Sequence, residues 1–331
     1  MKRCMEDNRQ NKRKKRKTFL YVLLTLLLIG GGGGIYAYQK FSPENYFKNV
    51  SVVTQPAEAS ETKPKSGVFN VLIMGTDQRP EDPAGHSDSM ILLHMNLDKK
   101  QYNAISIPRD TRVYVKDYDG YTKLTSVQYI VQAENNSLDD GVKAAAQAVS
   151  DLTGVPIHYY AETTYWGLRD IIDSLGGIDI KLPYDVEITH SWIPQNHGKV
   201  VAAGKQHLDG TMAVEVARER HAIAEGEFGR QQLQEKVLLS VADAMLEPQN
   251  IVKLPKFVKA LPDVITSTNM TQTDVLSLGL ALKSFKPGQL AYHQLPGEYT
   301  TRYDDLLQAN NDEFVVDSKE IKALVKKYFS N

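Results

Sequence analysis

Apolar residues occur in two patterns along residues 67–331, and each pattern predicts one kind of secondary structure. Short apolar runs bounded by turn residues predict strands, whereas apolar positions three and four residues apart predict amphipathic helices. The predicted strands are Val68–Met74, Met90–Met95, Tyr102–Ile107, Arg112–Val115, Ile157–Glu162, Ile178–Leu182 and Leu290–Leu295. The predicted helices are Leu138–Leu152, Tyr165–Leu175, Gln231–Leu246, Thr273–Phe285 and Lys319–Phe329, with a shorter helix that Asp209 caps. Strands mixed with helices predict a layered α/β domain, and the hairpin-like spacing of the first strands favours a mixed sheet.

The chain begins differently, with an uncharged stretch from Phe19 to Tyr38 behind a basic tail. As a helix this stretch would extend about 30 Å, the thickness of a bilayer core. A cleaved signal peptide is the alternative, but the glycine run and the aromatic residues after Ile29 do not resemble a cleavage site. Because basic flanks stay in the cytoplasm, we predict a cytoplasmic tail (1–18), a transmembrane helix (19–38), a linker (39–66) and an extracytoplasmic domain (67–331).

Composition and charge narrow the class of protein. Of 331 residues, 42% are hydrophobic and 24% are charged, which permits a sizeable core and excludes a disordered chain. The net charge of −1 conceals an uneven distribution, because the first 18 residues carry nine lysines and arginines against two acidic residues. Membrane orientation accounts for this basic tail, so we expect no nucleic-acid partner. Cys4 is the sole cysteine, which excludes a disulfide within the chain.

Two carboxylates flank a loop between predicted strands. Asp77 follows the first strand and Asp88 precedes the second, so the loop can bring both to one edge of the sheet. Ligands usually bind at such strand ends. Carboxylates without cysteine or a histidine cluster suit Mg²⁺, which completes its shell with water and phosphate oxygens. Loop aspartates that merely cap turns are the alternative.

Arginines recur at the edges of predicted elements. Arg109 follows a strand, Arg218 and Arg220 leave the helix that Asp209 caps, and Arg230 opens a long helix. The planar guanidinium fork matches phosphate oxygens. For each arginine by itself a solvated surface charge or a salt bridge is the favoured interpretation, but their repetition in an acidic domain favours one shared anionic ligand.

Several motifs in a fixed order identify a family resemblance. The ordered set VLIMGTDQR, GHSDSM, SIPRDT, KLTSVQY, DGTMAVEVARER and EFGRQ, behind a basic single-span N-terminus, resembles the LytR-CpsA-Psr family of Gram-positive cell-envelope proteins. The resemblance covers residues 69–245. It implies an α/β/α three-layer sandwich around a mixed sheet, with a long apolar pocket for a polyprenyl chain. It also implies Mg²⁺-dependent transfer of a glycopolymer, such as teichoic acid or capsular polysaccharide, from a polyprenyl-pyrophosphate carrier to peptidoglycan.

The same resemblance implies roles for individual residues. Asp77 and Asp88 would bind the metal, and with Arg109 they form the expected catalytic set. The pyrophosphate and the rest of the substrate would contact Arg79, Arg109, Lys123, Arg218, Arg220, Glu227 and Arg230. Asp88 is the first choice for the base that accepts the acceptor's proton, with Asp77, Asp110 and Glu227 left open. The protein would sit in the membrane of a Gram-positive bacterium, with its N-terminus in the cytoplasm and its partners, including membrane lipid, outside.

Three departures from the family pattern leave other functions open. His86 and Leu233 stand where the family usually has arginine, and Glu227 stands where it has aspartate. The loss of two donors favours, as an alternative, a non-catalytic protein that binds polyprenyl pyrophosphate or glycan and regulates the envelope. A pyrophosphatase that hydrolyses the same donor is a further alternative. A DNA-binding regulator is the weakest, because no helix-turn-helix pattern is evident.

Overall fold

The computed structural model describes residues 46–47, 50–57, 66–79, 81–223, 226–251, 253–283, 285–286 and 289–329. The predicted cytoplasmic tail and transmembrane helix lie outside these ranges. Within them, no helix combines the length and the apolar composition that crossing a membrane requires. Phe47, in the predicted linker, is fully buried and stacks on Phe69 at 4.7 Å between ring centroids, so this part of the linker packs on the domain.

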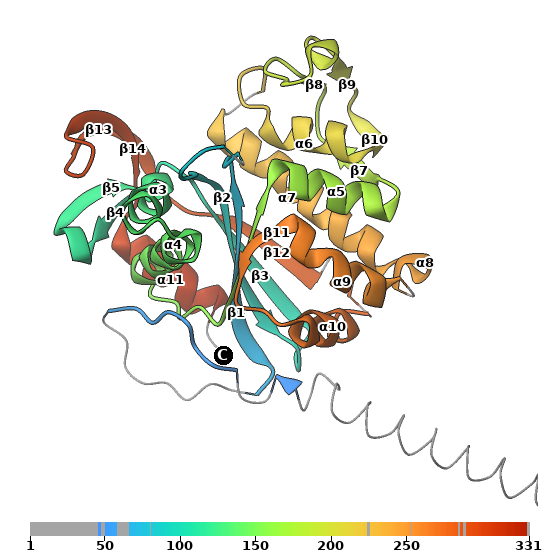
Figure 1. Ribbon diagram of the computed structural model, residues 1–331, viewed down its shortest axis with the longest axis horizontal. Coiled ribbons are helices and arrows are strands. Elements are labelled where there is room, and N and C mark those ends of the chain that lie inside the picture. The colour runs from blue at the N-terminus through green and yellow to red at the C-terminus, as the bar shows by residue number, and fades with distance from the viewer. Residues whose placement is uncertain are drawn as a thin grey trace, which may run out of the picture.

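A six-stranded mixed sheet forms the centre of the domain (Figure 1). Its order is β11-β6-β1-β2-β3-β12, in which β1 is parallel to β6 and antiparallel to β2, and β12 is parallel to β3. The predicted mixed sheet is therefore confirmed. The bounds are β1 (Val68–Thr76), β2 (Ser87–Asn96), β3 (Gln101–Ile107), β6 (Tyr159–Thr164), β11 (Ile265–Thr268) and β12 (Leu290–Gln294).

One face of the sheet is covered by α3 (Leu124–Asn135), α4 (Leu138–Thr153) and α11 (Ser318–Tyr328) (Figure 1). Leu72, Leu92 and Ile105 project from the strands into this layer and are fully buried. Helix α4 forms as predicted because Ser137 caps it and its first turn is acidic. It ends where Gly154 adopts a left-handed conformation (φ +72°), which glycine tolerates without strain.

The other face carries α9 (Leu254–Val264) and α10 (Gln272–Ala281), with a lobe built from α5, α6 and α7 beside them (Figure 1). This lobe has its own apolar core, separate from that of the sheet. It consists of α5 (Tyr165–Leu175), α6 (Gly210–Arg218), α7 (Glu227–Leu246), β7 (Ile178–Leu182), β10 (Gly204–Leu208) and the short pair β8 (Val186–Glu187) and β9 (Val200–Val201), with α8 (Pro248–Ile251) following α7. Asp209 caps α6 by accepting from Met212 N at 2.8 Å, as predicted.

Two hairpins extend from the sheet edge near the start of α3 (Figure 1). They are β4 (Arg112–Val115) with β5 (Gly120–Lys123), and β13 (Glu298–Asp304) with β14 (Ala309–Val315). The second hairpin, α3 and α9 had no counterpart among the predicted elements. The hairpin was missed because most of its residues are exposed and polar, so it has no apolar pattern.

Candidate active site

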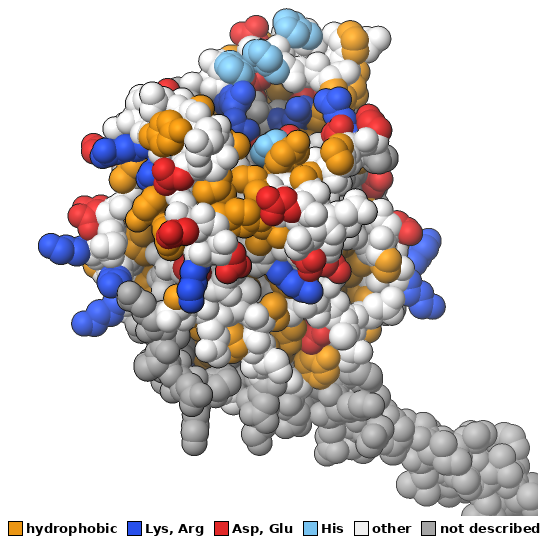
Figure 2. Space-filling model, turned by 60° about the vertical axis from the view of Figure 1, so that its left-hand side comes forward, with side chains coloured by type: hydrophobic (Ala, Val, Ile, Leu, Met, Phe, Trp, Pro, Cys, Tyr) orange, Lys and Arg blue, Asp and Glu red, His pale blue; other side chains and the backbone are white. Residues whose placement is uncertain are grey.

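A cavity of about 250 Å³ opens at the edge of the sheet where β2 begins and β3 ends. Figure 2 shows a hollow in which Lys and Arg side chains gather beneath a group of histidines. The lining residues come from β2, the loop after β3, and the lobe of α5, α6 and α7, which are far apart in sequence. They are Asp88, Arg109, Tyr165, His190, Glu215, Arg218, Glu219, Arg220, His221 and Arg230.

Asp88 lies at the centre of this cavity. The sequence placed it before a strand, but it lies within β2 as the extra residue of a bulge, because Thr76 pairs with Ser87 and Gly75 with Ser89. A bulge redirects the side chain of its extra residue. The Asp88 carboxylate accepts hydrogen bonds from Arg109 Nη1 at 2.7 Å and from Tyr165 OH at 2.8 Å.

These partners keep the Asp88 carboxylate ionised. Burial by itself acts to raise the pKa of Asp88. The charge of Arg109 and the hydrogen bonds from Arg109 and Tyr165 outweigh that effect, so the pKa lies below its usual range. Burial and the Asp88 charge raise the pKa of Tyr165, so its hydroxyl remains a donor. The pocket therefore holds a buried negative charge that is already compensated by arginine.

A buried polar network fixes the position of Asp88. The neighbouring Ser87 donates to Gln128 of α3, and Gln128 Nε2 donates to Glu162 of β6 at 2.5 Å. All three residues have no exposed surface. Glu162 also accepts from Thr266 Oγ1 at 2.7 Å. Since buried polar groups lose free energy when unpaired, this chain of hydrogen bonds ties the start of β2 to α3 and β6.

Arg218 is held between two aromatic rings. Its guanidinium carbon lies 4.2 Å from the centroid of Trp192 and 4.7 Å from that of Tyr165. Trp166 stacks on Trp192 with ring centroids 5.8 Å apart, which supports that ring. Cation–π contacts of this kind orient a guanidinium while its N–H groups remain available to a ligand.

Several arginine donors in this site make no hydrogen bond to described residues, and the nearest carboxylates of two of them, Asp110 at 3.7 Å from Arg109 Nε and Glu215 at 3.9 Å from Arg218 Nη1, lie beyond hydrogen-bonding distance. Within the part of the chain that the structure describes, the buried atoms Arg109 Nε, Arg218 Nη1 and Arg230 Nε make no hydrogen bond. A buried donor without an acceptor is costly, and the cost disappears when an acceptor binds. The three unpaired donors therefore favour an anionic ligand with several oxygen atoms.

Glu219 shapes the rim of the cavity. Its carboxylate accepts from the backbone N–H groups of Thr189, His221 and Arg220 at 2.7, 2.8 and 2.9 Å. Burial acts to raise its pKa, but these hydrogen bonds lower the pKa of Glu219 to about 2. They also hold Arg220 at the cavity and place the ring of His221 4.2 Å from that of His190.

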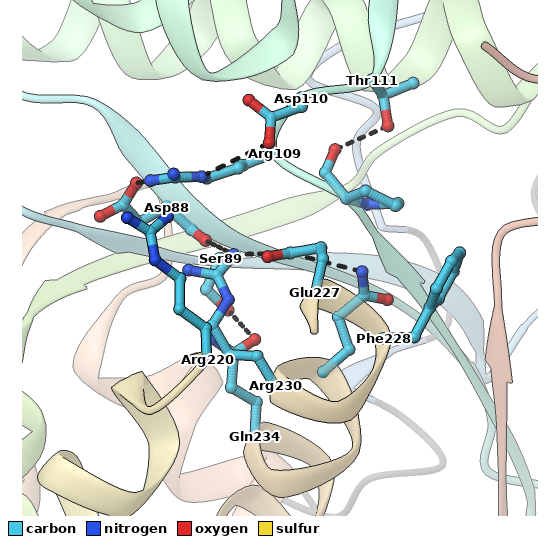
Figure 3. Close-up of polar contacts among 12 residues, drawn as sticks. Asp88, Ser89, Arg109, Asp110, Thr111, Arg220, Glu227, Phe228, Arg230 and Gln234 are labelled. Carbon is cyan, nitrogen blue, oxygen red and sulfur yellow. Dashed lines mark hydrogen bonds and ion pairs between the residues drawn. The ribbon is translucent and has the colours of Figure 1, made fainter. Parts of the chain in front are cut away.

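Two predicted substrate residues stand behind the arginines rather than in the lining. Glu227 accepts from Arg230 Nη2 at 2.6 Å, and the same nitrogen donates to Asp88 O at 3.2 Å. Lys123 Nζ lies 3.1 Å from Asp110 Oδ1, and Asp110 Oδ2 is 3.7 Å from Arg109 Nε. Figure 3 shows Arg109, Arg220 and Arg230 arranged around Asp88, with Asp110 and Glu227 beyond them.

Other predicted residues lie beside the cavity. Asp77 directly follows β1, and its carboxylate accepts from His86 N at 2.8 Å. His86 stacks on Tyr129 at 4.6 Å, and Arg79 is exposed. Leu233, which stands where the family usually has arginine, is fully buried in the apolar core of the α5–α7 lobe. The side chain at position 233 thus serves packing in this protein.

Sequence reasoning missed residues that act on the arginines and on Asp88. Tyr165, Trp192 and Gln128 contact the site from elements far away in sequence, and Glu219 accepts from the backbone beside Arg220. Gln128 lies inside the KLTSVQY motif, and Glu219 lies between the two predicted arginines, so both were within reach of motif comparison. Nothing in the local sequence singled out Trp192.

Comparison with known proteins gives a consistent assignment. The model of the LytR_cpsA_psr family matches residues 36–330. The polyisoprenyl-teichoic acid–peptidoglycan teichoic acid transferase TagU of Bacillus anthracis is 30% identical over 252 residues, covering 74% of this chain and 76% of TagU. The crystal structure of TagV from B. subtilis superposes with a TM-score of 0.65 at 25% identity, covering 80% and 98% of the two chains. A structure of TagT bound to LIIa-WTA, at 22% identity and a TM-score of 0.64 over 83% and 94%, shares the fold. The chain belongs to the LytR-CpsA-Psr family.

Proposed function

We propose that this protein transfers a glycopolymer of the teichoic acid class from a polyprenyl-pyrophosphate carrier to peptidoglycan. The observation that carries the proposal is the set of unpaired arginine donors that meet at the ionised Asp88. A pyrophosphate supplies the several oxygen acceptors that these donors lack. The name of the TagU relative gives a polyisoprenyl-linked teichoic acid as donor and peptidoglycan as acceptor.

Different residues of the cavity would contribute to different parts of the reaction. The acceptor hydroxyl oxygen forms a bond to the phosphorus that carries the polymer, and the bond from that phosphorus to the bridging oxygen breaks. The bridging oxygen leaves with the lipid phosphate, whose charge Arg109, Arg218 and Arg220 neutralise. The hydroxyl proton passes to a carboxylate. A general base works best with a pKa near the working pH, so the lowered pKa of Asp88 favours a permanently ionised role. Asp77, Asp110 and Glu227 are then the carboxylates to test as base, and none of the three lines the cavity.

Mg²⁺ is the cofactor that we propose. Asp77 and Asp88 fit it by chemistry, because they are hard oxygen donors at the same sheet edge and Asp88 is ionised. When bound, the ion would neutralise charge on phosphate oxygens. Among the described residues no group of three or more His, Cys, Asp or Glu forms a metal cage, so water and phosphate would complete the shell.

The polyprenyl chain requires an apolar surface. A second cavity of about 470 Å³ lies between α5, the end of α7 and α9, with Ile171, Leu175, Phe257 and Val264 among its lining residues. We propose this cavity for part of the chain, because α5 joins it to the arginine site through Tyr165. Attachment to the membrane by residues 19–38, with the N-terminus in the cytoplasm, is part of the same proposal and would bring the site to its lipid donor.

The full-length protein in detergent tests the function. Given a polyprenyl-pyrophosphate glycan, peptidoglycan fragments and Mg²⁺, it is expected to form a phosphodiester-linked product, detected by mass spectrometry. Donor binding without any product would instead support the non-catalytic regulator. Release of lipid phosphate without polymer attachment would support the pyrophosphatase.

Metal removal gives a separate prediction. Chelation of Mg²⁺ is expected to reduce product formation to background, and added Mg²⁺ should restore it. Asp77→Ala should raise the Mg²⁺ concentration for half-maximal turnover by about tenfold or more, since one ligand is lost. Titration calorimetry of Mg²⁺ in the presence of the lipid donor provides a readout besides activity. Unchanged Mg²⁺ affinity in Asp77→Ala would contradict the assignment of this ligand.

Trp192 gives a prediction about the aromatic support of Arg218. Trp192→Ala is expected to weaken binding of the lipid pyrophosphate by about threefold to tenfold, the effect of a lost cation–π contact of roughly 0.5–1.5 kcal/mol. Trp192→Phe keeps a ring and is the matched control, with most of the affinity retained. Binding is measured by fluorescence or calorimetry, with melting temperature as a check of the fold. Equal affinity in the alanine and phenylalanine variants would show that the ring does not position Arg218.

A further inference from the structure

We propose that a tyrosine-bearing surface on the two hairpins binds the glycan strand of the peptidoglycan acceptor. This surface, called here the tyrosine platform, consists of Tyr114, Tyr121, Tyr299 and Tyr303. The inference rests on the proposed function, since it assigns the second substrate of the same site. It assigns the peptidoglycan acceptor a binding surface outside the arginine cavity.

The two hairpins form one continuous unit. Arg112 Nη1 of β4 donates to Tyr303 O of β13 at 3.0 Å, and Thr122 Oγ1 of β5 donates to Asp304 Oδ2 at 2.8 Å. Backbone hydrogen bonds join Asp305 N to Tyr121 O at 2.8 Å and Phe314 N to Asp110 O at 2.9 Å. Phe314 is fully buried in the core beneath. The platform therefore stands on a fixed base rather than on a free loop.

The rings of the platform are exposed to a degree that is unusual for aromatic residues on ordered strands. The exposed fractions are 44% for Tyr114, 43% for Tyr121, 43% for Tyr299 and 49% for Tyr303. Tyr114 and Tyr121 are cross-strand partners with ring centroids 5.2 Å apart. Exposed apolar surface of this kind often marks a binding site.

The platform adjoins the arginine cavity. Lys123 and Tyr121 are two residues apart on β5, so both project from the same face of that strand, and Lys123 contacts Asp110 beside Arg109. Tyr299 approaches the site from β13, and burial together with the charges of Glu227 and Asp110 raises its pKa. A chain lying across the platform would thus end next to Arg109 and Asp110, where the acceptor hydroxyl is needed.

The charge of the hairpins favours one of the two polymers of the reaction, teichoic acid and peptidoglycan, over the other. Five acidic residues are exposed on residues 112–123 and 298–315, against two exposed basic residues, Lys116 and Arg302. The acidic residues are Asp117, Asp119, Glu298, Asp305 and Asp312. The partly exposed Arg112 and Lys123 are paired with Glu313 and Asp110. A surface with this excess of negative charge repels a polyanion such as teichoic acid. An uncharged sugar backbone meets no such repulsion, which favours the glycan strand of peptidoglycan.

Tyrosine suits this ligand for physical reasons. The negative face of its ring attracts the slightly positive C–H groups of a sugar, and the hydroxyl can bond to sugar oxygens. Its side chain has few rotatable bonds, so little conformational entropy is lost on binding. Rings spaced along two hairpins can contact successive sugars of one extended strand.

Binding to sacculi stripped of wall polymers tests the platform. The full-length variant Tyr121→Ala/Tyr303→Ala is expected to bind sacculi about tenfold more weakly than wild type, as truncation of central aromatic residues usually does. In the transfer assay the KM for peptidoglycan fragments should rise, with little change in the KM for the lipid donor. Tyr121→Phe/Tyr303→Phe retains the rings and should bind within about twofold of wild type. Leu280→Ala removes an equally exposed apolar side chain from α10 and should have no effect.

The outcomes separate this inference from the proposed function. Sacculus binding equal to wild type in the double alanine variant, at an unchanged melting temperature, would overturn the platform. Weaker binding of free teichoic acid with unchanged binding of sacculi would also overturn it, because the donor polymer would then occupy the surface. Absence of transfer by the wild type, together with platform-dependent sacculus binding, would instead refute the transferase and leave the platform standing.

Discussion

Arg109→Ala is expected to reduce transfer by about 100-fold to 1000-fold, the usual effect of removing one donor that stabilises transition-state charge. Arg109 donates to Asp88 at 2.7 Å and keeps a second donor, Nε, unpaired in the cavity. Its loss removes a phosphate contact and leaves the Asp88 charge without its main partner. Turnover of the lipid-linked polymer and binding of the lipid pyrophosphate are measured separately, so that chemistry and affinity are distinguished.

Two further variants define what Arg109 contributes. Arg109→Lys keeps the charge but loses the fork geometry, and we expect a loss intermediate between wild type and Arg109→Ala. Arg169→Ala removes an arginine of α5 that pairs with Asp170 and does not line the arginine cavity, so transfer should be unchanged. Wild-type turnover by a folded Arg109→Ala variant would refute the site assignment.

Asp88→Asn is expected to reduce transfer by at least about 100-fold while the protein remains folded. The substitution conserves shape but removes the charge that pairs with Arg109 and would hold Mg²⁺. Loss of a charge-assisted hydrogen bond should also lower the free energy of unfolding at neutral pH by about 1.5–3 kcal/mol. Turnover and denaturant unfolding are the two measurements. Asp179→Asn, which alters an exposed carboxylate paired with His207, is the control and should change neither.

The pH dependence of this effect follows from the lowered pKa of Asp88. A carboxyl whose pKa is lower in the folded protein stabilises the fold above its unfolded pKa of about 4, and the contribution disappears as the pH falls through the folded pKa. The difference in unfolding free energy between wild type and Asp88→Asn should thus be largest at neutral pH and shrink below about pH 4. A difference that stays constant from pH 7 to pH 3 would contradict the pairing of Asp88 with Arg109.

Helices and strands were predictable where the local sequence contains the turn residues that bound them. Helix α5 and strand β7 have the predicted bounds because Gly176 and Gly177, both at positive φ, separate them. By contrast, the predicted helix Thr273–Phe285 gave way to α10 (Gln272–Ala281), whose start follows the capping box of Thr271 and Asp274. Strands β13 and β14 were not predicted because contacts with β4 and β5 stabilise them, rather than an apolar pattern of their own.

The candidate site, too, was predictable only in part from the sequence. Motifs identified Asp88, Arg109, Arg218, Arg220 and Arg230, and all five line one cavity. They did not show that Arg218 lies against Trp192, that Gln128 and Glu162 fix the start of β2, or that Leu233 packs in a core. The contacts of Arg218 with Trp192, of Gln128 with Glu162 and of Ser87 with Gln128 join residues 26, 34 and 41 positions apart.

The family, the mixed α/β class and the residue types that suit a phosphate were predictable from the sequence alone. These follow from local periodicity, from capping and turn residues, and from ordered motifs, all of which are properties of short stretches of sequence. Which arginine donors make no hydrogen bond, that Asp88 is held ionised, and that four tyrosines of the two hairpins are exposed follow from the tertiary structure alone. Burial and pairing depend on which distant segments pack together, and packing is a property of the whole folded chain.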